Sequence, residues 1–199
     1  MKFSNALRAA CAAGVIVLLS GCAHDITISG DNSALASKTA APINKTIGLV
    51  ITDEERNKEV VSPGGGGDKV SYKPYQDLEL PIYLELGNIF KDVVKLNSTP
   101  DAATSQSKNL SYIVTPTITT TSSSPSLLTW PPTDFTVTLQ CTVTDPTGKL
   151  VMTTAVTGSG HAEFSEFKRN FGLAAQRATL DAVQKMQSAM QDSAELRSN

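Results

Sequence analysis

Few side chains in this sequence could act as a nucleophile or as a general acid or base. The tetrapeptide Gly158-Ser159-Gly160-His161 places a serine near a histidine. Because neighbouring side chains in a strand point to opposite faces, we do not expect this stretch to build a catalytic pair. Glu163 and Glu166 follow closely, and we interpret them as solvated charges rather than acid–base partners of His161. The sequence therefore predicts a protein that is not an enzyme.

Metal and cofactor sites are not expected either. Of the three cysteines, Cys11 lies in an N-terminal leader, and Cys141 shares the apolar face of an alternating strand with Leu139 and Val143. One thiol and one histidine do not make a three-ligand zinc site without carboxylates. We expect Cys141 to be buried and inert, with a reactive thiol or an intermolecular bridge as the alternative. The glycines at 64–67 lack the Gly-Lys-Ser/Thr ending of a phosphate loop and are interpreted as a plain loop.

The start of the chain has the layout of a secretory signal. Lys2 and Arg8 are basic, the stretch 9–19 is apolar, and Ser20 and Gly21 are small. An apolar run of about 11 residues is too short to span a bilayer, which takes roughly 20. The sequence predicts that this leader is removed.

The four residues Leu19-Ser20-Gly21-Cys22 resemble the lipobox of bacterial lipoproteins. The resemblance implies that residues 1–21 are a signal peptide and that Cys22 carries acyl chains, palmitate among them, as a membrane anchor. Two or more such chains hold a protein stably on a bilayer. Ala23, rather than an aspartate, follows the cysteine. By the sorting rule of Gram-negative lipoproteins, this implies the outer membrane, facing the periplasm of the cell envelope.

The net charge and the chain length limit the possible partners and the number of domains. The net charge of −2 argues against a nucleic-acid partner, because binding nucleic acid requires a basic surface. We expect residues 22–44 to form a flexible tether that places the domain about 25 Å from the membrane. His24 would lie in this tether. Residues 45–193 are expected to form one domain, and 194–199 a tail.

Two elements are predicted in the first half of the domain. The run Thr46–Thr52 is continuously apolar and fits a strand buried on both faces. The stretch Leu78–Leu96 has apolar residues at helical spacing and predicts a helix, with Pro81 in its first turn. Gly87 would weaken that helix or allow close approach to a sheet. The segment Asn97–Asn109 is polar and reads as a loop.

The second half predicts strands and a long helix. From Leu110 the apolar period is two, and Pro116 suggests an edge or bulge in that strand. Apolar residues alternate with threonines over 135–144, and the turn Asp145-Pro146-Thr147-Gly148 leads to a partner strand. The final helix is expected over about Glu166–Ser193, with aromatic, alanine and methionine residues on its core side.

A loop between two of these strands is the best candidate for contact with a partner. It contains the only tryptophan, Trp130, together with Leu127, Leu128, Pro131 and Pro132. Tryptophan is enriched at binding hot spots and at membrane interfaces. Two readings stay open: Trp130 folds back to cap the core, or it contacts a partner or lipid.

The sequence thus predicts an α/β (α+β) domain with a small, mostly antiparallel sheet of about four strands and two helices packed on it, in the order strand-helix-strand-strand-strand-helix. This order, on a lipobox tether, resembles the YajG-like outer-membrane lipoproteins. It is also similar to the lipopolysaccharide-assembly, curli-secretion and penicillin-binding-protein activator lipoproteins. The resemblance covers about 46–193 and implies a non-enzymatic accessory lipoprotein that binds an envelope protein. The alternative is direct binding of lipid, glycan or peptidoglycan.

Overall fold

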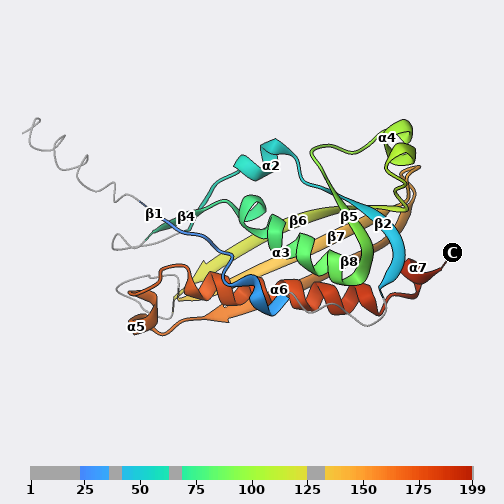
Figure 1. Cartoon of the computed structure of the whole chain (residues 1–199). Helices are drawn as coiled ribbons and strands as arrows, with labels where there is room; N and C mark the ends of the chain where they lie inside the picture. The colour runs from blue at the N-terminus through green and yellow to red at the C-terminus, as the bar shows by residue number, and fades with distance from the viewer. Residues whose placement is uncertain (1–22, 36–41, 63–68, 125–132, 199) are drawn as a thin grey trace, which may run out of the picture.

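Two β-sheets and a set of helices make up the computed structural model, which describes residues 23–35, 42–62, 69–124 and 133–198 (Figure 1). The larger sheet has five strands, in the order β5 (Phe90–Leu96), β2 (Ile43–Val50), β6 (Tyr112–Ser123), β7 (Asp134–Thr144) and β8 (Leu150–His161). The smaller sheet has three strands, in the order β1 (His24–Asp25), β4 (Val70–Tyr72) and β3 (Val60–Val61). The α+β class is confirmed, but the single sheet of about four strands is only roughly right.

The larger sheet is mixed rather than mostly antiparallel. Strand β2 pairs in parallel with both β5 and β6, whereas β6, β7 and β8 pair antiparallel. Ile47, Leu49 and Val50 of β2 are all buried, which confirms a strand covered on both faces. A central position between two parallel partners explains this continuous apolar run.

Helices cover one face of the five-stranded sheet. The helical elements are η1 (Asn32–Leu35), α2 (Asp53–Asn57), α3 (Pro74–Ile89), α4 (Ala102–Ser107), α5 (Phe164–Phe167), α6 (Leu173–Gln191) and α7 (Ala194–Arg197). Helix α3 packs over β5 and β6, α6 packs over β7 and β8, and the two helices contact each other (Figure 1). The main hydrophobic core fills the space between these two helices and the sheet.

The helix expected over Leu78–Leu96 is wrong in its second half. Helix α3 ends at Ile89, and residues 90–96 form strand β5 beside β2. Val93 and Val94 fit either a helical stripe or a strand, and pairing with β2 decides for the strand. Pro74 takes the first helical position, so Pro81 lies inside the helix rather than in its first turn. Gly87 has open space around it, not a close sheet.

The long helix expected over Glu166–Ser193 is broken into α5 and α6, and the expected tail 194–199 contains the short helix α7. The predicted core side is nonetheless confirmed: Ala174, Ala178, Ala182, Met186 and Met190 are buried. Helix α6 lies directly on β8, because that strand offers glycines there. A Cβ atom added to Gly158 or Gly160 would collide with the α6 backbone.

The β7–β8 hairpin follows the prediction. Gly148 has φ 86°, and its N–H donates to the carbonyl of Asp145 over 3.0 Å. Cys141 is fully buried, and burial raises the pKa of its thiol to about 12. Pro116 faces a true edge, since β6 pairs with β2 only over Tyr112–Val114.

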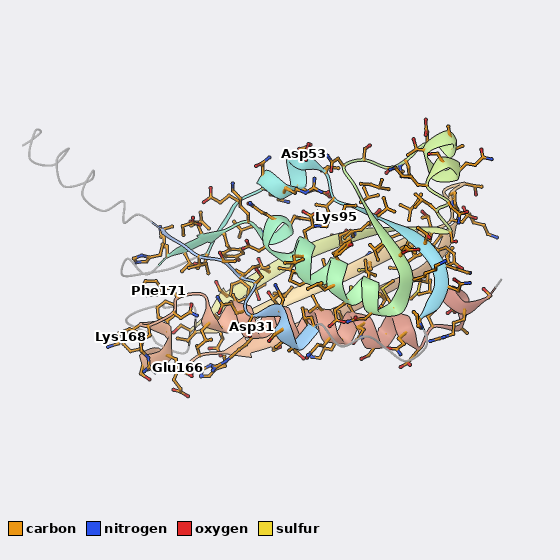
Figure 2. All side chains as sticks on the ribbon, viewed as in Figure 1. Asp31, Asp53, Lys95, Glu166, Lys168 and Phe171 are labelled. Atoms are coloured by element: carbon orange, nitrogen blue, oxygen red, sulfur yellow. The ribbon has the colours of Figure 1, made fainter. Side chains whose placement is uncertain are left out.

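The segment expected to be a flexible tether packs onto the domain over residues 24–35. Ile28 and Leu35 are 0% and 2% exposed, and His24 stacks on Phe171 with 4.5 Å between ring centroids (Figure 2). The backbone of Ile28 donates to Asp77 over 3.0 Å, and Asn88 donates to the carbonyl of Leu35 over 2.7 Å. We call residues 24–35 the strap. The buried isoleucine and leucine explain why this segment does not stay free.

The expected loop at 97–109 also contains helix α4, which Asp101 caps by accepting from the N–H of Thr104 over 2.7 Å. A second, smaller core lies beneath this segment on the sheet face opposite α3 and α6. It consists of Val50, Leu96, Leu110 and Ile113, with Val94 packed against it.

Candidate binding surface

The sheet face away from α3 and α6 is a broad polar surface on β6, β7 and β8. Its side chains alternate with the buried and half-buried residues of the same strands. They are Thr117, Thr119, Thr121 and Ser123 of β6; Thr136, Thr138, Gln140 and Thr142 of β7; and Thr153, Ala155, Thr157 and Ser159 of β8. The strand register places these residues opposite one another in rows.

Hydroxyl groups of neighbouring strands bind each other across this face. The Oγ1 atoms of Thr121 and Thr136 are 2.6 Å apart, and those of Thr138 and Thr157 are 3.1 Å apart. Cross-strand threonine pairs stabilise a sheet. The face therefore presents hydroxyl and amide groups, two pairs of which are tied together across the strands, and it is suited to binding a polar partner.

One end of this face carries charge. Asp134 and His161 are opposite each other in the β7–β8 register, and Ser123 is opposite Asp134 on β6. The Nδ1 atom of His161 lies 2.7 Å from Oδ1 of Asp134, and its Nε2 lies 3.4 Å from Glu163. The hydrogen bond to Asp134 raises the pKa of His161 above its usual value. A depression of about 380 Å³ opens beside this row.

The expectation that Ser159 and His161 point to opposite faces is wrong. They are two residues apart on β8, so strand alternation puts them on the same side, and both line that depression. Among the described residues, no serine or threonine hydroxyl hydrogen-bonds to His161. Glu166 pairs with Arg177 instead, and the hydrogen bond from Arg177 lowers the pKa of the Glu166 carboxyl to about 2. The arrangement lacks the nucleophile–base contact of a hydrolase.

The loop proposed to contact a partner, with Leu127, Leu128, Trp130, Pro131 and Pro132, lies outside the described residues. Its two connections are described: the last β6–β7 pair is Ser123 with Asp134. The loop therefore departs from the charged end of the polar face. Cys22 also lies outside the described residues, two positions before β1.

The outer edge of β8 is closed by side chains of α6. Three α6 residues, one per turn, bind backbone groups of alternate β8 residues. Arg177 donates to the carbonyl of His161 over 2.6 Å, Asp181 accepts from the N–H of Ser159 over 2.9 Å, and Lys185 donates to the carbonyl of Thr157 over 3.0 Å. Covering an edge in this way prevents another strand from adding to it.

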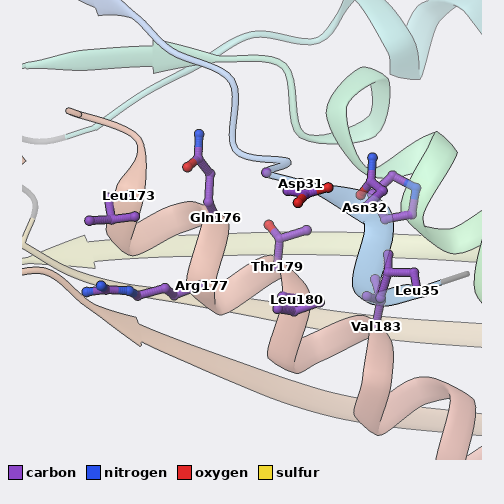
Figure 3. A pocket seen from close by; sticks show the side chains of 11 residues that line it. Asp31, Asn32, Leu35, Leu173, Gln176, Arg177, Thr179, Leu180 and Val183 are labelled. Carbon is purple, nitrogen blue, oxygen red and sulfur yellow. The ribbon is translucent and has the colours of Figure 1, made fainter.

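A mainly apolar pocket of about 300 Å³ lies between the strap, α3 and α6 (Figure 3). Its apolar walls come from Leu35, Pro81, Leu173, Leu180 and Val183, and its polar rim from Asp31, Asn32, Gln176 and Arg177. The hydroxyl of Thr179 also lines the pocket. That residue is 2% exposed, and its Oγ1 has no hydrogen-bond partner in the described part of the protein. A buried, unsatisfied hydroxyl is costly and invites a ligand or water.

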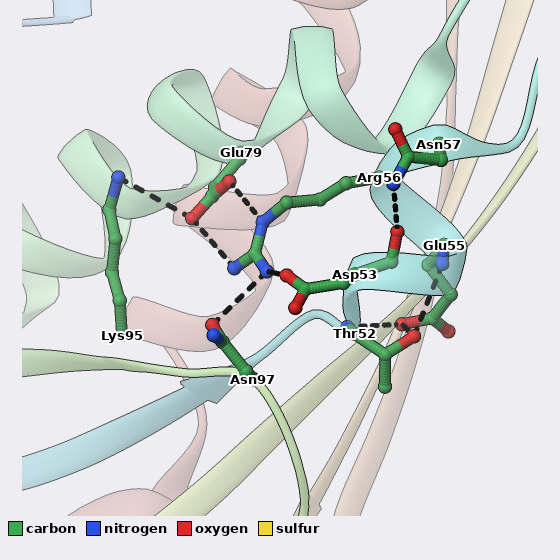
Figure 4. Close-up of polar contacts among 8 residues, drawn as sticks. All are labelled: Thr52, Asp53, Glu55, Arg56, Asn57, Glu79, Lys95 and Asn97. Atoms are coloured by element: carbon green, nitrogen blue, oxygen red, sulfur yellow. Dashed lines mark hydrogen bonds and ion pairs between the residues drawn. The ribbon is translucent and has the colours of Figure 1, made fainter.

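A cluster of charged side chains joins α2 to α3 and β5 (Figure 4). Arg56 donates to Glu79 through Nε over 2.8 Å and to Asp53 and Asn97 through Nη1 over 2.8 and 3.1 Å. Lys95 lies 3.5 Å from Glu79. The hydrogen bond from Arg56 holds the pKa of Glu79 below its usual value. Every partner in the cluster is paired, so we interpret it as a structural clamp.

Among the described residues, no helix is long and apolar enough to cross a membrane. No group of three or more histidine, cysteine, aspartate or glutamate side chains there could hold a metal ion. The sequence did not identify Asp134 as the partner of His161, nor Thr179 as a pocket residue. The pairing of Asp134 with His161 could have been found by counting residue pairs outward from the hairpin turn.

No family model matches this sequence, and no curated protein matches it. Several solved structures are similar in backbone. One is a Xanthomonas campestris protein of the family DUF330, at 10% identity and TM-score 0.48 over 85% of this chain and 97% of that one. A minor lipoprotein from Acinetobacter baumannii has 13% identity and TM-score 0.43 over 75% and 94%. A PelC dodecamer from Paraburkholderia phytofirmans has 14% identity and TM-score 0.41 over 73% and 94%.

Proposed function

We propose that this chain is a non-enzymatic accessory lipoprotein of the bacterial envelope. Acyl chains on Cys22 hold it on the periplasmic side of the outer membrane, where it binds another envelope protein. The lipobox pattern of residues 19–22 supports the anchor. The polar face of β6, β7 and β8 supports the binding role, because it is a large ordered surface left open by the helices.

The observation that carries the binding role is the meeting of this face with the ends of the 125–132 loop. The row Ser123–Asp134–His161 closes the face at the point where that loop departs. The connection between these two strands contains Leu127, Leu128, Trp130, Pro131 and Pro132, so a hot-spot type of side chain follows directly in the sequence from a polar surface. Binding interfaces commonly have this composition.

Site-specific photo-crosslinking in living cells tests this role. A photoreactive amino acid at Thr138, in the middle of the face, should form a discrete protein adduct. The same group at Lys108, beyond α4, should not form that adduct. Trp130→Ala should weaken the adduct, because a hot-spot side chain contributes about 2 kcal/mol or more.

The soluble domain provides the necessary control for Trp130. If Trp130 contacts the partner, Trp130→Ala barely changes the melting temperature. If Trp130 caps the core, the same change costs about 3–5 kcal/mol of stability. A large stability loss, or equal adducts from Thr138 and Lys108, rejects the proposed binding surface.

The second candidate function is direct binding of a lipid, glycan or peptidoglycan fragment. The observation that favours it is the apolar pocket with the unsatisfied Thr179 hydroxyl. Native mass spectrometry of protein purified from envelopes should then show a bound small molecule. Leu180→Trp, which would fill the pocket, should remove it. A spectrum of the bare protein from the start would count against this function.

A further inference from the structure

We propose that the end of the domain carrying β1 and α5 rests on the surface of a membrane that contains anionic phospholipid. The contact is made by Phe164 with the basic side chains of Lys69, Lys168 and Arg169, which we call the anchor-side surface. This inference rests on the proposed anchoring at Cys22 and adds the orientation of the domain.

The distance between anchor and domain is short. The strap begins at His24, whose N–H donates to the carbonyl of Lys69 over 2.8 Å. Two residues of extended chain reach at most about 7 Å. Acyl chains on Cys22 would therefore hold β1 close to the lipid headgroups, not about 25 Å away as a free tether of 22–44 would allow.

A ladder of aromatic rings links β1 to α5. His24 stacks on Phe171 at 4.5 Å between ring centroids, and Phe171 contacts Phe167 at 5.0 Å. Phe167 is buried and fixes α5 against the domain. Lys168 and Phe171 lie at the end of the molecule where the chain enters β1 (Figure 2). The start of β1 and α5 therefore share one end of the domain.

Phe164 is the exposed aromatic residue of this end. It is 50% exposed, and the Nζ atom of Lys168 lies 5.1 Å from its ring centroid. An aromatic ring with a lysine that can extend its ammonium outward is a combination suited to a lipid interface. A single exposed apolar residue is common on protein surfaces. We therefore infer the lipid contact from the ring together with the basic side chains around it.

The local charge favours an anionic surface. Lys69, Lys168 and Arg169 form no ion pair with any described carboxylate. The nearby acidic groups are Glu166, which is paired with Arg177 at 3.0 Å, Glu163 and Asp134, which flank His161, and Asp25, which is exposed on β1. Three unpaired cations thus stand against two carboxylates, namely Asp25 and whichever of Asp134 and Glu163 the single imidazole of His161 does not balance. Each basic residue near an anionic membrane strengthens binding about fivefold.

Fluorescence quenching on vesicles tests this contact in the full lipidated protein. An environment-sensitive dye on Ser165→Cys, within α5, should be quenched by a quencher carried on the lipid headgroups. The vesicles contain phosphatidylethanolamine with phosphatidylglycerol. The same dye on Lys108→Cys should remain unquenched, because that residue follows α4 at the opposite end (Figure 1). Cys141 is buried and should take no dye.

Charge and ring variants supply matched comparisons. Lys168→Glu with Arg169→Glu should reduce quenching at position 165 severalfold, while the protein still floats with vesicles. Phe164→Ser should also reduce it. Leu150→Ser should not reduce the quenching. Leu150 is exposed to a similar degree, at 58%, but it lies at the other end of β8, about 36 Å away along an extended strand.

The outcomes separate the two proposals. A protein that floats but shows equal quenching at 165 and 108, or quenching at 165 that ignores the charge variants, overturns the anchor-side surface and leaves the lipid anchor standing. A protein that carries no fatty acid and does not float overturns both.

Discussion

His161 and Asp134 face each other across the final β7–β8 pair, with 2.7 Å between Nδ1 and Oδ1. This contact fixes the imidazole ring at the end of the polar face where the 125–132 loop departs. It also favours the protonated form of the ring, because a carboxylate stabilises the imidazolium.

The first prediction concerns this pair. The hydrogen bond from Asp134 raises the pKa of His161 above its unfolded value of 6.5. The pair therefore stabilises the fold fully below about pH 6, and this contribution is lost as the pH rises through the raised pKa. NMR titration should show a lower pKa for His161 in Asp134→Asn. An unchanged pKa would show that Asp134 is not its main partner, and Glu163→Gln is the matched control.

The second prediction concerns the contact of α6 with β8. A Cβ at position 158 would lie 2.8 Å from the Cα of Ala182 and closer still to the carbonyl of Ala178. Gly158→Ala should cost about 1–3 kcal/mol or more, because backbone atoms on both sides cannot yield easily. Chemical denaturation measures this.

Gly87 provides the control for that experiment. It lies inside α3 with nothing within 4 Å of an added Cβ. Gly87→Ala should raise the free energy of unfolding by up to about 1 kcal/mol, as expected for a helix interior. If Gly158→Ala and Gly87→Ala changed the free energy of unfolding alike, the prediction that α6 packs closely on β8 would be wrong.

The third prediction concerns the strap. Ile28 is fully buried, so Ile28→Ala should cost about 2–5 kcal/mol. Leu80→Ala changes a residue that is 47% exposed, and it should stay within about 0.5 kcal/mol of the parent protein. Thermal melts measure the stability of the two variants. If the strap were not packed on the domain, Ile28→Ala would cost as little stability as Leu80→Ala.

The fourth prediction concerns Cys141. Because burial raises the pKa of this thiol to about 12, it carries almost no thiolate at neutral pH. Maleimide should label the native domain slowly and the denatured chain rapidly. Fast labelling of the native domain would contradict the burial of this face of β7.

The fifth prediction concerns the anchor. Cells fed a clickable fatty acid should label the parent protein and Cys141→Ala but not Cys22→Ser. The reason is that Cys22 alone follows the Leu-Ser-Gly triplet of the leader. Normal labelling of Cys22→Ser would remove the basis for the proposed anchor.

The sequence by itself determined the elements whose patterns are local. The alternation over 135–144 and the Asp145–Gly148 turn defined the β7–β8 hairpin, because strand period and turn chemistry are read within a few residues. The burial of Cys141 followed from the same alternation. The spacing of alanines and methionines likewise predicted the core side of the final helix, and glycines 158 and 160 of β8 allow that side to lie close to the strand.

Only the tertiary structure decided the points where a segment had two locally acceptable states. Residues 90–96 form a strand because they pair with β2 along its outer side. No local sequence pattern reveals this pairing. The strap was ordered by Asp77, Asn88 and Gln176, side chains that lie far from it in sequence. The His161–Asp134 pair required the strand register, and the pocket at Thr179 required α3, α6 and the strap together. Such contacts arise from long-range packing, and packing overrides local propensity wherever the latter is weak.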